Sequence, residues 1–185
     1  LFILMGNIMN SAGITDRIFA FATACVGWLR GGLCHANILA SVIFAGMSGS
    51  AVADAGGVGT LEIKAMKDEG YDAETAAAIT AASATIGPII PPSLPMVIYG
   101  VSADVSIGGL FLAGVIPGLL MAGGLMAMVV QVAKKRDLPR HPFPGAAQLW
   151  VAYKEAHWAL MTPVILFGGM MAGIFPPTEA AAVAT

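Results

Sequence analysis

The stretch FAGMSGSAVADAGGVG, residues 44–59, decides the fold of this chain. It consists mostly of glycine, serine and alanine with one aspartate, and it has almost no large side chains between Met47 and Val58. Apolar segments lie close to it on the N-terminal side. A polar, glycine-rich backbone at membrane depth is tolerated only where protein or a watery cavity surrounds it. The stretch therefore predicts an irregular segment that enters a membrane without crossing it.

The composition as a whole is that of an integral membrane protein. Hydrophobic residues make up 57% of the chain and charged residues 11%, and the mean hydropathy is +0.81, whereas soluble domains are about one quarter charged. A net charge of -2 without a basic stripe argues against a nucleic-acid partner. Cys25 and Cys34 lack the spacing of a metal or redox motif, which favours two buried thiols.

Residues 1–30 are expected to hold the end of a scaffold helix followed by an arm helix. Residues 15–30 start with Thr and Asp, and residues 1–10 are apolar but too short to span. Sixteen residues rise about 24 Å, less than the roughly 30 Å of a bilayer core, so we expect a helix along the interface. Its predicted apolar face consists of Ile18, Phe21, Ala22, Cys25 and Leu29. Because no initiator methionine precedes this segment, we expect a fragment of a longer protein.

The glycine-rich stretch is flanked by two helices that are each too short to span. Residues 33–45 are apolar and rise about 20 Å as a helix, and residues 58–67 become charged toward their end. Two half-length helices joined by a flexible tip are typical of a re-entrant hairpin, which enters and leaves the bilayer on one face. The sequence thus predicts a first hairpin over residues 31–68.

Residues 75–101 are long enough to cross the membrane, but the segment is interrupted in the middle. Proline removes a backbone donor and clashes with the preceding turn, so a helix breaks there. We predict two half-helices with an unwound GPIIPPS segment, residues 87–93, between them. The breaking residues are Gly87, Pro88, Pro91, Pro92 and Pro95.

Residues 107–133 are predicted to form a complete transmembrane helix. The basic cluster KKRDLPRH follows within a loop over residues 134–147, and the positive-inside rule places it in the cytoplasm. Counting back through one span and the broken helix places the 62–74 loop on the same side. Within residues 148–185, we expect an interfacial stretch over 148–157 and another span over 158–174, with an aromatic belt formed by Trp150, Tyr153 and Trp158.

The hairpin tip and the unwound segment together predict an ion site. Half-helix ends leave carbonyl and N–H groups unpaired, and discontinuous helices mark the binding sites of secondary transporters. Na+ prefers hard oxygen ligands, and the predicted ligands are the hydroxyls or carbonyls of Ser48, Gly87, Ile90, Pro92 and Ser93. The free N–H groups of a helix start suit a carboxylate, so the predicted substrate residues are Gly49, Ser50, Ala51 and Asp54.

Other interpretations of these residues remain open. Small residues such as Gly46 also serve close helix packing, and Asp54 is about as compatible with a position near water. The GMSG motif matches the GxSG pattern of rhomboid-type intramembrane proteases, where Ser48 would need a histidine base on another helix. His141 and His157 lie in cytoplasmic or interfacial segments, and His35 is on the same hairpin. We therefore expect no enzyme activity.

Four ordered motifs resemble one known family. MSGSAVADAGGVG, AAITAASATIGPIIPPSLPMVIYG, LFLAGVIPGLL and GIFPPTEAAAVA together resemble the DctM-like large membrane subunit of tripartite ATP-independent periplasmic (TRAP) transporters. The resemblance implies an all-α, elevator-type transporter of the bacterial inner membrane with two inverted repeats and a hairpin in each. Only part of that architecture is present, and residues 148–185 would start the second repeat. Pro177, Thr178 and Glu179 match a family signature, although Pro176 stands where Thr is common.

The same resemblance implies a function and partners. It implies sodium-driven import of organic acids such as C4-dicarboxylates or sialic acid, with Na+ as the coupling ion and no organic cofactor. A periplasmic binding protein would deliver the substrate, and a small four-helix membrane subunit would be the second partner. The absence of a P-loop pattern from the sequence is consistent with transport without ATP. The alternative within the transport class is an ion-coupled anion carrier of similar fold that needs no binding protein.

Overall fold

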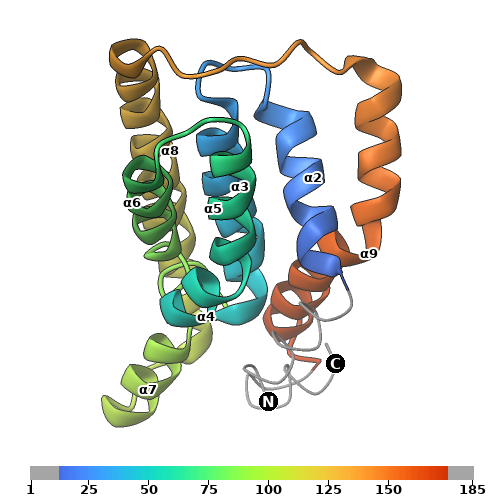
Figure 1. Cartoon of the computed structure of the whole chain (residues 1–185). Coiled ribbons are helices and arrows are strands. Elements are labelled where there is room, and N and C mark those ends of the chain that lie inside the picture. Colours follow the sequence, from blue (N-terminus) through green and yellow to red (C-terminus); the bar gives the residue numbers. More distant parts are fainter. Residues whose placement is uncertain (1–12, 175–185) are drawn as a thin grey trace.

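Residues 13–174 are described by a computed structural model, and over this range the chain is helical without strands (Figure 1). The expectation of an all-α fold is confirmed for these residues. The helix end expected in residues 1–10 and the signature at Pro177 to Glu179 lie outside them. The helices are α2 (Ile14–Val26), α3 (Gly32–Ser48), α4 (Ala51–Gly56), α5 (Val58–Asp68), α6 (Ala73–Ala84), α7 (Leu94–Ser102), α8 (Ile107–Arg136) and α9 (Gly145–Met171).

Helix α2 is shorter than predicted, and only part of its predicted apolar face is buried. It starts after Gly13, which has a φ of 70°, and ends at Val26 before reaching Arg30. Phe19 is buried, whereas Phe21 and Cys25 of the predicted face are only half-buried. The helix packs against both α3 and α9, and this two-sided contact shifts the buried face by part of a turn. Ile18 and Ala22 are buried as predicted.

Helix α3 is the centre of the molecule, because α2, α5, α6, α8 and α9 all pack against it (Figure 1). It extends three residues beyond the predicted arm, to Ser48, and ends where Gly49 takes the left-handed conformation that often terminates helices. The side chain of Ser50 then caps the short helix α4 by accepting a hydrogen bond from the N–H of Ala53. Helix α5 returns alongside α3, so the chain makes a helical hairpin.

The proline-rich segment interrupts the next helix. Helix α6 ends at Ala84 and α7 begins at Leu94, with Ser93 as its N-cap. Residues 85–93 between them form turns. The missing donors of the prolines account for the interruption, because a continuous helix needs an N–H at each of these positions.

Helix α8 is the only described helix that is both long and apolar enough to cross a membrane. Its 30 residues rise about 45 Å, more than a bilayer core requires. Helix α9 does not meet that test. It is one continuous helix with Pro163 inside it, and it runs through Trp158 without a break. The interfacial stretch over 148–157 and the span over 158–174 stay predictions.

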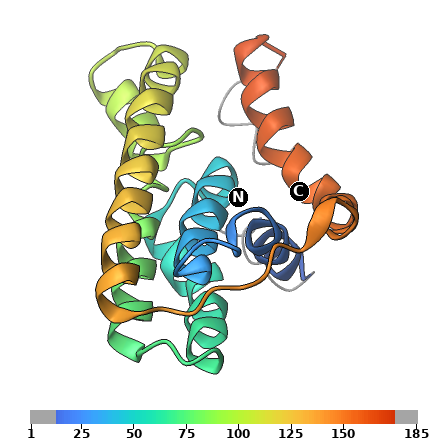
Figure 2. The same cartoon turned by 90° about the horizontal axis from the view of Figure 1, so that it is seen from above.

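The linker between α8 and α9 crosses one end of the bundle, as Figure 2 shows. The carbonyl of Pro139 accepts a hydrogen bond from the N–H of Gly31 at 3.1 Å, and Arg140 Nε donates to the carbonyl of Trp28 at 3.0 Å. His141 Nε2 lies 2.6 Å from Glu69 Oε2. The basic linker and the turn after α5 thus lie at the same end of the molecule. Their predicted cytoplasmic location requires this arrangement.

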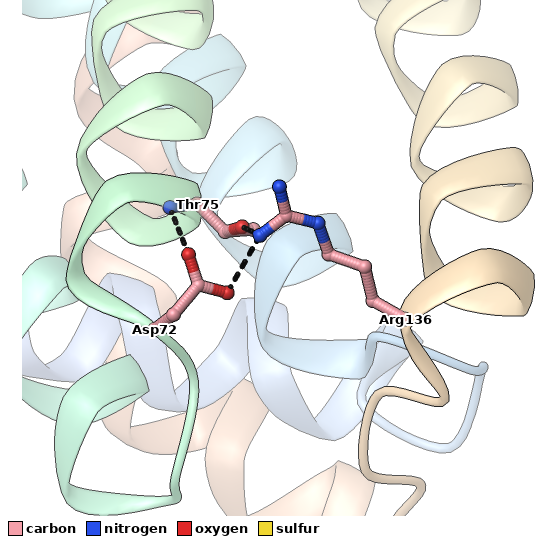
Figure 3. A network of polar contacts seen from close by, with 3 residues as sticks. All are labelled: Asp72, Thr75 and Arg136. Atoms are coloured by element: carbon pink, nitrogen blue, oxygen red, sulfur yellow. Dashed lines mark hydrogen bonds and ion pairs between the residues drawn. The ribbon is translucent and has the colours of Figure 1, made fainter.

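The start of α6 is joined to the end of α8 at this same end of the bundle (Figure 3). Arg136 Nη1 donates to Asp72 Oδ1 at 2.9 Å and to the hydroxyl of Thr75 at 2.6 Å. The other oxygen of Asp72 accepts a hydrogen bond from the N–H of Thr75 at 2.8 Å. Asp72 is therefore both the N-cap of α6 and the partner of a charge on α8.

Candidate functional site

The tip of the hairpin touches the unwound segment directly. The N–H of Leu94 donates a hydrogen bond to the carbonyl of Gly49 at 3.3 Å. A Cβ atom on Gly49 would overlap the carbonyl oxygen of Pro92, and Gly49 has a φ of 60°. Both the close approach and the left-handed conformation favour glycine here. The structure thus brings the residue at the end of α3 together with the start of α7.

Asp54 lies inside this contact. It is only 3% exposed, which argues against a position near water. The hydroxyl of Ser48 donates to Asp54 Oδ1, whereas Oδ2 is enclosed and has no hydrogen-bond partner. A Cβ atom on Gly87 would overlap Oδ2. The free oxygen of this carboxyl group therefore packs against Gly87 of the unwound segment. The role of Asp54 in substrate binding stays a prediction.

The serine hydroxyls of the site hold the local backbone. Ser93 donates to the carbonyl of Pro88 and accepts from the N–H of Met96 at 3.3 Å. Ser48 accepts a hydrogen bond from the N–H of Ser50 at 3.4 Å. Hydroxyl oxygens carry two lone pairs, so one of them remains available as a ligand in each case.

The N–H groups predicted for a substrate carboxylate are partly engaged. The N–H of Gly49 donates to the carbonyl of Ala45, and that of Ser50 donates to Ser48, both at 3.4 Å. Ser50 and Ala51 are half-buried. Ala51 lines a shallow pocket with Ala81 and Ala84 of α6. The role of these residues in substrate binding stays a prediction.

Ile90 is placed differently from the other predicted ligands. A Cβ atom on Gly118 of α8 would overlap Ile90 Cγ1, so this side chain packs toward α8. It also lines an apolar cavity of about 440 Å³ between α3, α8 and α9. Only the backbone carbonyl of Ile90 is suited to the proposed role. Gly46 lines the same cavity, and a Cβ atom on it would lie 2.5 Å from Pro163 Cβ, which favours the packing interpretation for Gly46.

Two buried polar features lie beside the predicted site residues. Asn37 Nδ2 donates to the hydroxyl of Thr80 at 2.7 Å, and its Oδ1 accepts from Ser83 at 2.6 Å. Ser41 donates to Ser83 at 3.0 Å. This polar cluster, Asn37, Ser41, Thr80 and Ser83, joins α3 to α6. Its sequence signal is polar residues one helical turn apart on each helix.

Glu62 is the second such feature. The sequence placed it in a cytoplasmic loop over residues 62–74, but it lies on α5 and is 1% exposed. That placement is wrong because the helix continues to Asp68 and turns one face inward, where Val58, Gly59 and Met66 are also buried. Glu62 is followed by the charged residues Lys64, Lys67 and Asp68, so the local sequence does not indicate that its side chain is buried.

The arrangement needed by a serine protease is not formed in residues 13–174. Ser48 donates to Asp54, His141 lies against Glu69, and His157 lies 3.2 Å from the hydroxyl of Tyr153. His35 is buried, and neither of its ring nitrogens has a hydrogen-bond partner. The described residues therefore contain no serine–histidine pair. What they offer is a group of carbonyl, hydroxyl and carboxylate oxygens, the donors that hard cations such as Na+ prefer.

Comparison with known proteins is consistent over the whole chain. Residues 1–185 match the family described as "Tripartite ATP-independent periplasmic transporter, DctM component". The chain is 54% identical over 183 residues to the sialic acid TRAP transporter permease protein SiaT of Haemophilus influenzae, covering 99% of this chain and 30% of that protein. It is 54% identical to the sialic acid large permease protein SiaM of Vibrio cholerae, covering 100% of this chain and 43% of that protein. It is 44% identical to the C4-dicarboxylate TRAP transporter large permease protein DctM of V. cholerae, and the match covers 99% of this chain and 40% of that protein.

Proposed function

Because the chain belongs to the DctM component family of TRAP transporters, we propose that it is part of the membrane permease of a sodium-coupled importer of organic acids. The chain spans 30% to 43% of the length of the three relatives described above. It therefore contributes one part of a longer transport machine. The contact between the hairpin tip and the unwound segment, with Asp54 enclosed between them, is the observation that carries the proposal.

Sialic acid is the proposed substrate within the class of organic acids. The two relatives named as sialic acid permeases are 54% identical to this chain. Relatives named for C4-dicarboxylates and for 2,3-diketo-L-gulonate are 44% and 42% identical. The second hairpin that the family resemblance implies would supply the rest of the substrate site.

In the proposed mechanism, the sodium site is formed by the hairpin tip and the unwound segment. The neutral oxygens would come from the predicted ligands Ser48, Gly87, Ile90, Pro92 and Ser93. Asp54, predicted from the sequence as a substrate residue, would add a negative charge to the sodium site, because Ser48 is hydrogen-bonded to it. A bound Na+ would supply the positive charge that compensates this carboxylate and attracts the carboxylate of the substrate. Gly49 keeps the two segments in contact through Leu94, so both adopt the binding geometry together.

The moving part would consist of the hairpin and the broken helix, which the polar cluster Asn37, Ser41, Thr80 and Ser83 joins. These elements would slide against a scaffold that includes α2. The glycine pairs 31–32 and 56–57 are suitable hinges. The proposed setting is the bacterial inner membrane, with a small membrane subunit and a periplasmic binding protein as partners.

The test is substrate uptake into proteoliposomes that contain the full-length permease, its small subunit and its binding protein. Sialic acid uptake is measured with and without an inward sodium gradient for wild type, Ser48→Ala and a control, Ser102→Ala, at an exposed position at the end of α7. We expect uptake to depend on sodium in all three proteins. The sodium concentration that gives half-maximal uptake should be higher in Ser48→Ala than in wild type and Ser102→Ala. Uptake that ignores sodium would refute the proposal.

Leaving out the binding protein separates the two transport alternatives. A TRAP permease is expected to lose uptake under this condition, whereas a carrier that needs no binding protein would retain it. The same preparation, challenged with C4-dicarboxylates as competitors, tests the assignment of sialic acid.

A further inference from the structure

Glu62 is a buried acidic side chain that the proposed sodium site does not use. It is 1% exposed, and its Oε1 atom is enclosed without a hydrogen-bond partner. The two ion pairs found among residues 13–174 involve Asp72 and Glu69 instead. An ionised carboxylate buried without a cation is strongly unfavourable, because it loses its hydration and gains nothing in exchange. Some ligand must therefore neutralise Glu62 in the packed hairpin.

No neighbouring helix supplies a compensating positive charge. The buried face of α6 consists of Thr75, Ala76, Ile79, Thr80, Ser83 and Ala84, and that of α2 of Thr15, Ile18, Phe19 and Ala22. None of these side chains is an acid or a base in the physiological range. The charged residues Arg17 on α2 and Glu74 on α6 are exposed.

The titratable groups that do face inward are not basic partners of Glu62. Helix α3 contributes Cys34 and His35, α4 contributes Asp54, and Tyr71 follows α5. Neither ring nitrogen of His35 has a hydrogen-bond partner, and the hydroxyl of Tyr71 has none. Asp54 belongs to the same hairpin and is itself an acid, so it offers Glu62 no positive charge.

We propose that Glu62 is a proton-binding site and is held as the neutral acid among α3, α5 and α6. A proton fits this position better than a metal ion, because Glu62 lies within a regular helix that packs against the helices α3 and α6. Their carbonyls are committed to helix hydrogen bonds, whereas the tip site has carbonyls from an interrupted helix. This proposal takes from the proposed function only that the hairpin lies in a membrane. It does not require that transport is coupled to sodium.

Infrared difference spectroscopy on the full-length permease tests the protonation state directly. The carbonyl stretch of a protonated carboxyl group is separate from the bands of ionised carboxylates. At neutral pH we expect wild type to show a protonated-carboxyl band that Glu62→Gln loses. Glu74→Gln, an exposed glutamate at the start of α6, is the matched control and should keep it. An unchanged band in Glu62→Gln would overturn the proposal.

Thermal unfolding as a function of pH gives an independent readout. If the folded protein holds a proton on Glu62 more tightly than the unfolded protein does, stability is present at low pH and is lost as the pH rises. We expect the unfolding temperature of wild type to fall relative to that of Glu62→Gln as the pH rises above the pKa of glutamate in the unfolded chain, about 4.3. Parallel curves would contradict the proposal. Failure of Glu62→Gln to fold would contradict it too, because glutamine resembles the neutral acid. Neither readout depends on uptake, so the sodium proposal stands or falls separately.

Discussion

Glycine sets how closely the hairpin tip approaches the unwound segment. A side chain on Gly49 would overlap the carbonyl oxygen of Pro92, and the backbone conformation of Gly49 is left-handed. The neighbouring Asp54 is likewise accommodated because Gly87 has no side chain. Gly49 and Gly87 thus permit the contact between the hairpin tip and the unwound segment. Substitutions at either position should lower transport more than they lower the stability of the fold.

Gly49→Ala is therefore expected to separate the tip from the unwound segment. The left-handed backbone alone costs a non-glycine residue about 1–2 kcal/mol, and the overlap with Pro92 adds to this. Uptake in proteoliposomes should be largely lost, with a modest fall in the unfolding temperature. Gly123→Ala on α8 is the control, since this position is exposed and a Cβ atom there would meet nothing within 4 Å. Equal uptake in the two variants would argue against a functional contact at Gly49.

The buried amide of Asn37 offers a second test on single residues. Asn37→Ala removes the donor to the hydroxyl of Thr80, whereas Ser83 can still donate to the carbonyl of Thr80. An unsatisfied buried group costs about 1–3 kcal/mol. Thermal unfolding of Asn37→Ala, Ser83→Ala and the double variant measures the coupling between α3 and α6. We expect the two effects to be non-additive by about 0.5–3 kcal/mol. Strict additivity would show that the cluster does not join the helices energetically.

The helix ends at one end of the bundle depend on charge. Asp72 caps α6 and pairs with Arg136 of α8. Its pKa is held below the usual range, first by the hydrogen bond from the N–H of Thr75 and also by the Thr75 hydroxyl and the Arg136 guanidinium. This connection between two helices is exposed to solvent, so salt weakens it as well.

The lowered pKa of Asp72 gives a pH dependence with a definite sign. A carboxyl group with a depressed folded-state pKa stabilises the protein above its unfolded-state pKa, about 3.9, and the stabilisation is lost as the pH falls through the lower folded-state value. Wild type should unfold at a higher temperature than Asp72→Asn near neutral pH. The difference should shrink below about pH 4. A constant difference over this range would show that ionisation of Asp72 contributes nothing.

Local rules predicted the element that proline controls. The unwound segment predicted over residues 87–93 lies within the observed interruption at residues 85–93, because proline chemistry acts within a few residues. The glycine-rich stretch 44–59, predicted to be irregular, is instead helical except at Gly49, Ser50 and Gly57. Part of the buried face of α2 and the burial of Glu62 were missed. They depend on which helices pack against each other, and sequence periodicity contains little of that information for helices that are apolar on most sides. The contact between Asp54 and Gly87 was missed for the same reason.

The whole molecule presents much of its apolar surface outward. Along α8, Ile116 is 69% exposed and Leu120 71%, and Val101 at the end of α7 is 71% exposed. Such a surface suits lipid or further protein segments rather than water. The two ends of α8 lie far apart, with α7 near one end and the basic linker at the other (Figure 1).

The orientation of the whole molecule is testable by labelling. Ala103→Cys before α8 and Ala146→Cys at the start of α9, both at exposed positions and at opposite ends of the bundle (Figure 1), are placed singly in full-length protein that lacks Cys25 and Cys34. A membrane-impermeant maleimide should label position 103 in right-side-out vesicles and position 146 in inside-out vesicles. Labelling of both from one side would refute a membrane-crossing α8, and the reverse pattern would refute the cytoplasmic position of the linker.

The linker over residues 137–144 also sets a mechanical limit. It is the covalent strap between α8 and α9, and it is fastened to the α2–α3 turn through Pro139 and Arg140 and to the end of α5 through His141. Fully extended, a strap of this length reaches roughly 29 Å. The end of α8 and the start of α9 therefore cannot move farther apart than this distance. A large displacement also requires that the contacts of Pro139, Arg140 and His141 break first. The strap thus limits how far α8 and α9 can separate, and its three attachments add to the barrier for any large separation.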